Sequence, residues 1–98
     1  MLTSKQRGYL SRLAADMEPT VMVGKGGATE AVERAMKAEF AFRELLKLRF
    51  VASKDERDEL ARGLAERTGA ELVRVIGHVA VYYRRADDAE RRNIELPS

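Results

Sequence analysis

Three glycines surround one lysine in the stretch VGKGGATE, residues 23–30, between a short apolar run and a segment with helical periodicity. A strand that ends in glycines and leads into a helix presents backbone N–H groups and the positive end of the helix dipole. Anions bind in such a place, and the lysine adds a point charge. The candidate phosphate-binding residues are therefore Gly24, Lys25, Gly26 and Gly27.

The glycine spacing excludes two common phosphate-binding motifs. The Walker A sequence GxxxxGK[ST] cannot be drawn, because Lys25 is followed by glycine rather than by serine or threonine. The dinucleotide fingerprint GxGxxG fails at its third glycine, where the chain has Thr29. What remains is GxxG, the loop with which KH-type modules clamp an RNA backbone. The same spacing also suits a plain strand-to-helix turn that needs a positive φ.

Positive charge is concentrated in a few segments, although the formal net charge of the 98 residues is only +2. Residues 45–54 and 72–85 each carry three lysines or arginines and no acidic residue. Residues 1–27 carry four basic groups against two acidic ones. Acidic residues outnumber basic ones in the rest of the chain. Charge separated in this way favours a polyanionic partner.

A second group of candidate residues lies on predicted strands and on the first predicted helix. The segment LLKLRFV, residues 45–51, alternates between apolar and basic side chains, which predicts a strand with one solvated face. Basic residues would neutralise phosphates there, and a tyrosine would stack on a base. These candidates are Lys47, Arg49, Arg84 and Tyr82, with Lys5 and Arg12 at the periphery. Ordinary sheet packing remains the alternative for the tyrosines Tyr82 and Tyr83.

Three helices are expected. Two of them begin with a capping box, in which two side chains satisfy backbone N–H groups reciprocally, formed by Thr3 with Gln6 and by Ser53 with Glu56. The second helix begins at Thr29 or Ala28, while Pro19 and Gly69 end the first and third. Their predicted apolar faces are Leu10, Leu13, Ala14 and Met17, then Val32, Ala35, Met36 and Phe40, then Leu60, Ala61, Leu64 and Ala65.

Four strands complete the predicted domain: a short buried strand at residues 20–23, and strands at 45–51, 71–76 and 79–84. Gly77 and His78 join the last two strands as a two-residue hairpin connection. The order helix, strand, helix, strand, helix, strand, strand predicts an α/β two-layer sandwich with a mixed four-stranded sheet over residues 1–85. For residues 86–98 two alternatives stay open, a solvated charged tail and a segment that docks through Ile94 and Leu96. Whether Lys47, Arg49, Arg74, Tyr82 and Arg84 share one sheet face depends on the strand pairing.

The residue types present give little support to an enzyme. The one histidine, His78, falls in a turn, the chain has no cysteine, and no serine is paired with a base. We therefore expect no catalytic residue, no metal and no cofactor. The N-terminus lacks the apolar region of a secretory signal, and no apolar stretch approaches the roughly 18 residues of a membrane span. The expectation is a monomeric cytoplasmic protein with no membrane partner.

The chain resembles the CRM domain family (chloroplast RNA splicing and ribosome maturation), and in particular its bacterial single-domain, YhbY-like members. The matching stretches follow the family's order and cover almost the whole chain. They are LTSKQR at 2–7, Leu13-Ala14, Pro19, VGKGG at 23–27, Thr29-Glu30, ELLKLRF at 44–50, TGA at 68–70, VIG at 75–77 and IELP at 94–97.

This resemblance implies a fold similar to the C-terminal domain of bacterial translation initiation factor three. It also implies RNA binding and association with precursors of the large ribosomal subunit. The family's GxxG loop maps onto residues 24–27, its basic strand pair onto Lys47 and Arg49, and its aromatic-arginine strand end onto Tyr83 and Arg84. An alternative class is a protein-interaction module of the translation or ribosome-assembly apparatus whose basic face binds an acidic protein.

Overall fold

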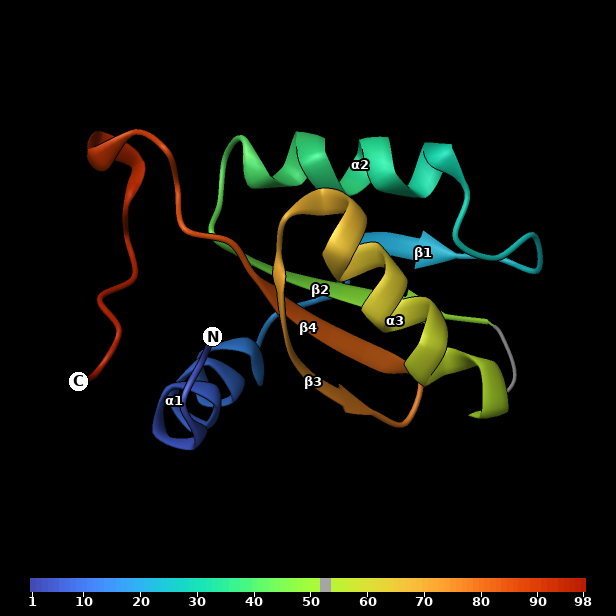
Figure 1. The fold of residues 1–98 in the computed structure, drawn as a ribbon, viewed down its shortest axis with the longest axis horizontal. Helices are drawn as coiled ribbons and strands as arrows, with labels where there is room; N and C mark the ends of the chain where they lie inside the picture. The colour runs from blue at the N-terminus through green and yellow to red at the C-terminus, as the bar shows by residue number, and fades with distance from the viewer. Residues whose placement is uncertain (52–53) are drawn as a thin grey trace.

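The computed structural model describes residues 1–51 and 54–98 (Figure 1). The elements follow the predicted order: α1 (Ser4–Ala14), β1 (Val21–Val23), α2 (Glu30–Phe40), β2 (Leu45–Phe50), α3 (Lys54–Thr68), β3 (Glu71–Ile76), β4 (Val79–Tyr83) and a short 3-10 helix, η1 (Ala89–Arg91). Among the described residues, none of the helices combines the length and the apolar composition needed to cross a membrane.

The four strands form one mixed sheet in the order β1-β2-β4-β3. β1 runs parallel to β2, and β4 runs antiparallel to both of its neighbours, β2 and β3. α2 and α3 pack on one face of this sheet, and α1 packs on the opposite face over β2, β4 and β3 (Figure 1). The predicted α/β sandwich with a mixed four-stranded sheet is therefore confirmed, with α1 covering part of the second face.

The strand alternation divides the buried residues into two cores. The core under α2 and α3 contains Val21, Val23, Val32, Met36, Phe40, Leu46, Leu48, Phe50, Ala61, Leu64, Ala65, Ala80 and Tyr82. The smaller core under α1 contains Leu2, Leu10, Ala14, Leu45, Val73, Val81 and Tyr83. Because successive side chains of a strand point to opposite faces, the same strands β2 and β4 supply both cores.

Three predicted core positions are exposed instead. Leu13 is 41% exposed because α1 meets the sheet through the narrow stripe of Leu10 and Ala14, and because the helix ends at Ala14, well before Pro19. Ala35 is exposed because α2 packs through a stripe of residues four apart. Met22 is 56% exposed because β1 is an edge strand whose α1-side face is uncovered.

The predicted starts of α1 and α2 and the predicted end of α3 agree with the structure, but the prediction that Pro19 ends the first helix is wrong, because α1 already ends at Ala14. Thr3 and Gln6 form the capping box of α1, with both backbone-to-side-chain bonds present. The Thr29 hydroxyl accepts the Val32 N–H at the start of α2. α3 is followed by Gly69, which has the positive φ of +72 expected of a helix stop. The predicted capping residue of α3, Ser53, lies outside the described residues.

The segment after β4 lies against the domain in the structure. The carboxylate of Glu44, only 3% exposed, accepts backbone N–H groups from Ala86, Asn93 and Ile94 at 2.9, 2.8 and 3.0 Å. Ile94 and Leu96 pack against the core under α1. The Gln6 side chain also donates to the carbonyl of Pro97 at 3.0 Å, which brings the C-terminus beside α1 (Figure 1). Glu44 thus acts as a buried clamp on the tail.

Candidate functional site

The GKGG loop, residues 24–27, is an exposed turn between β1 and α2 (Figure 1). The Gly27 N–H donates to the Gly24 carbonyl at 3.0 Å, so that Lys25 and Gly26 occupy the tip of the turn. Gly27 has a φ of +79, in the left-handed region that favours glycine. The predicted need for a positive φ is therefore real, and the Lys25 side chain is exposed at the tip.

The loop leads directly into the N-terminus of α2, where backbone N–H groups and the helix dipole favour an anion. Two acidic residues in the first turn of α2 oppose that effect, but each faces an arginine. Glu30 lies 3.7 Å from Arg34, and Glu33 lies 2.8 Å from Arg67 of α3. These pairs offset part of the negative charge near the loop.

Alanine substitutions at two loop glycines test whether the turn requires a left-handed backbone conformation at Gly27. Gly27→Ala is expected to lower the free energy of unfolding by about 1 kcal/mol, because an L-residue at φ +79 is strained. Gly24→Ala is the matched control: its φ is not positive and an added Cβ meets nothing within 4 Å. Chemical denaturation of the two variants measures the difference. Equal stabilities would contradict a left-handed turn at Gly27.

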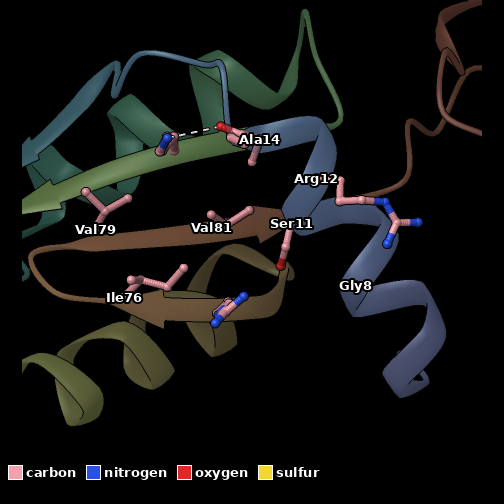
Figure 2. Close-up of a pocket in the computed structure, with 10 residues that line it drawn as sticks. Gly8, Ser11, Arg12, Ala14, Ile76, Val79 and Val81 are labelled. Atoms are coloured by element: carbon pink, nitrogen blue, oxygen red, sulfur yellow. Dashed lines mark hydrogen bonds between the residues drawn. The ribbon is translucent and has the colours of Figure 1, made fainter.

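The structure separates the two members of the basic strand pair. The Lys47 ammonium donates to the carbonyls of Ala14 and Met17 at 3.0 and 3.1 Å, and the bond to Ala14 is the dashed line in Figure 2. Lys47 is half-buried and stabilises the end of α1, where a cation also complements the helix dipole. Arg49 lies two residues further along β2 and is exposed. Of the pair, Arg49 is the one whose side chain is exposed to solvent.

Strand pairing settles which candidates share a face. Lys47 is paired with Val81, and Val81 with Arg74, so both basic residues point to the α1 side of the sheet with Arg49. Alternation along ELVRVI placed Arg74 on a strand face, but only the register shows that it joins this group.

Tyr82 points to the opposite side. It is fully buried, and its hydroxyl donates to the Ala61 carbonyl of α3 at 2.9 Å. Burial also raises the pKa of this tyrosine. These contacts correct the expectation that its ring is available for stacking.

The remaining candidates lie apart from the loop. Arg84 is half-buried near the C-terminal end of α2, with its guanidinium 4.0 Å from the Asp87 carboxylate. α2 has 11 residues, so this end lies about 16 Å along the helix from the loop. On α1, the guanidinium carbon of Arg12 lies 6.0 Å from the Tyr9 ring centroid, and Lys5 is exposed in the first turn. Arg12, Lys47 and Arg74 line one groove between α1 and the sheet, but Lys5 and Arg84 do not.

The protein is thus a small α/β domain with a mixed four-stranded sheet, in which a GxxG loop joins an edge strand to the N-terminus of a helix. The chain belongs to the CRS1 / YhbY (CRM) domain family, whose profile it matches over residues 2–84. The predicted resemblance is thus confirmed over the domain, and the docked tail lies beyond the matched region.

Two named relatives match along nearly their whole length. A protein of Bacillus subtilis (strain 168) named "Probable RNA-binding protein YqeI" is 31% identical over 98 residues, covering 99% of this chain and 100% of its own. A protein of Haemophilus influenzae named "RNA-binding protein" is 32% identical over 97 residues, covering 98% and 95%. The solution structure of the hypothetical protein SAV1595 from Staphylococcus aureus is 40% identical, covers 99% and 100%, and superposes with a TM-score of 0.86.

Proposed function

We propose that this protein binds RNA by holding backbone phosphates at the GKGG loop and at Arg49. The observation that carries the proposal is the exposed left-handed turn at the N-terminus of α2 with Lys25 at its tip. The names of the Bacillus and Haemophilus relatives support RNA as the ligand. Chemistry on the RNA is not part of the proposal, since no nucleophile is paired with a base at the loop.

The loop suits a phosphate backbone for three reasons. Gly24 and Gly26 carry no side chain, so a polynucleotide can approach the main chain closely. The Gly27 N–H is taken by the Gly24 carbonyl, so the amide assigned to phosphate is that of Gly26, beside the Lys25 ammonium. Arg49 of the neighbouring strand β2 is paired with Met22, two residues before the loop, which puts a second cation near the loop. Phosphate contacts of this kind hold RNA without reading its sequence.

Charge reversal at the tip tests the proposal. Lys25→Glu is expected to weaken RNA binding about tenfold and to leave the melting temperature unchanged, because the exposed side chain contacts phosphate and not the fold. Lys37→Glu, on the exposed side of α2, changes the net charge equally and serves as the control. Fluorescence anisotropy with a labelled RNA at fixed salt measures both affinities. Unchanged binding by a folded Lys25→Glu protein would contradict the loop assignment.

The RNA partner is proposed to be ribosomal RNA of large-subunit precursors in the cytoplasm, as the CRM resemblance implies. Sedimentation of a cell lysate through a gradient tests this choice. The protein should co-migrate with large-subunit precursors at low salt, and should leave them at higher salt or in the Lys25→Glu variant. Migration at the top of the gradient under every condition would contradict the ribosomal assignment. It would not contradict RNA binding, which the anisotropy experiment tests separately.

A further inference from the structure

A groove of about 610 Å³ lies between α1 and the sheet (Figure 2). Its floor is apolar and consists of Ile76, Val79 and Val81. The charged residues that line it are all cationic, namely Arg12, Lys47 and Arg74, although the Arg12 side chain points away from the sheet (Figure 2). Within the described part of the chain, no acidic residue lines this groove, whereas four other surface grooves each include at least one acidic residue. The groove therefore combines an apolar surface with positive charge.

An open strip connects this groove to the GKGG loop. One row of paired residues, Met22, Arg49, Val79 and Ile76, crosses all four strands on the α1 side of the sheet. α1 does not reach this row, since Met22 is 56% and Ile76 is 52% exposed. Three inter-strand spacings make the strip about 14 Å long. It starts two residues before the loop and ends inside the groove, so one ligand can contact both.

Unpaired nucleotides fit this strip better than a duplex does. In A-form RNA the bases are stacked inside, and the protein meets phosphates and 2′-hydroxyls. Such a surface would leave the apolar floor uncovered. An unstacked base can cover Val79 and Ile76, while its phosphates meet the guanidinium groups of Arg49 and Arg74. An acidic peptide would also match the positive charge. The strip is continuous with the GKGG loop, whose backbone suits phosphate, and this favours RNA.

We propose that the strip and the groove form a subsite for unpaired nucleotides, which makes the protein selective for single-stranded over duplex RNA. The inference rests on the RNA-binding function proposed above. It assigns Arg74, Ile76 and Val79 to nucleotide contacts, and it keeps Lys47 as a structural residue beneath them.

Binding of one strand in two forms tests the subsite. The probes are a labelled oligouridylate and the same strand annealed to oligoadenylate, titrated at one salt concentration. The single strand is expected to bind about tenfold more tightly. Ile76→Ser and Arg74→Ala should each weaken single-strand binding about fivefold and leave duplex binding unchanged. Phe42→Ser is the matched control for loss of an exposed apolar side chain, since Phe42 is 80% exposed and does not line the groove.

Three other results would each contradict the subsite, and each has a different consequence for the proposed RNA-binding function. Equal binding of both probes, unaffected by the groove variants but weakened by Lys25→Glu, removes the subsite and keeps the proposed RNA-binding function. Absence of binding to either probe removes both. Capture of an acidic amphipathic peptide of alternating glutamate and leucine that depends on Arg74, without any preference between the RNAs, assigns the groove to a protein partner.

Discussion

Replacing Glu44 with alanine is expected to lower the free energy of unfolding by about 3 kcal/mol and to release the tail from the domain. The carboxylate accepts the N–H groups of Ala86, Asn93 and Ile94, and its side chain is almost entirely buried. Without it, three backbone donors at the docked tail lose their acceptor. Glu44→Gln keeps one acceptor oxygen and should lose less. Amide hydrogen exchange at these three residues, with chemical denaturation, measures both effects.

The same clamp predicts a pH dependence. Burial by itself would raise the pKa of Glu44, but the three backbone N–H bonds and the Arg92 guanidinium outweigh it, so the pKa lies below its ordinary value of 4.5. A carboxyl group with a lowered folded-state pKa stabilises the fold above pH 4.5 and loses that contribution as the pH falls through its folded pKa. Tail protection should therefore fall in acid. Unchanged protection in Glu44→Ala, or throughout an acid titration below pH 4.5, would contradict the clamp.

Lys47→Met is expected to lower the free energy of unfolding by about 2 kcal/mol, because two charge-assisted hydrogen bonds to the end of α1 are lost. Methionine keeps most of the length and the apolar part of the side chain. Arg49→Met is the matched variant two residues away, on the same face of the same strand. It should leave stability within about 0.5 kcal/mol and weaken RNA binding several-fold.

Thermal denaturation and RNA anisotropy of the two variants give opposite patterns if this division of roles is correct. Lys47→Met should change the melting temperature far more than the affinity measured below that temperature, and Arg49→Met should do the reverse. A stable Lys47→Met protein that binds RNA weakly would contradict the structural role of Lys47.

Local signals predicted most of the fold. Alternation in residues 45–51 identified β2 and placed Leu46, Leu48 and Phe50 in one core. The capping residues Thr3 and Thr29 marked helix starts correctly. The exposed positions Leu13 and Ala35 were missed because the width of a buried helix stripe depends on the element packed against it. Periodicity within the helix does not contain that information.

The candidate site was predictable only in part, for a similar reason. The glycine spacing located the left-handed turn at Gly27. The carbonyl partners of Lys47 lie 33 and 30 residues earlier in the chain, so its structural role could not be read from strand alternation. Alternation also showed that Tyr82 and Tyr83 point to opposite faces, but not that helices cover both. The groove beside Arg74 depends on strand pairing, which one sequence leaves open.

Residue-resolved chemical-shift mapping would show directly whether RNA binds at the GKGG loop, the strip and the groove. The 15N-labelled protein would be titrated with oligouridylate at low salt while each backbone amide is followed. We expect the largest shifts at residues 24–29, at Arg49, and along the strip and groove to Ile76 and Arg74. Shifts confined to α3 and to the tail after β4, with the GKGG loop unchanged, would contradict this expectation.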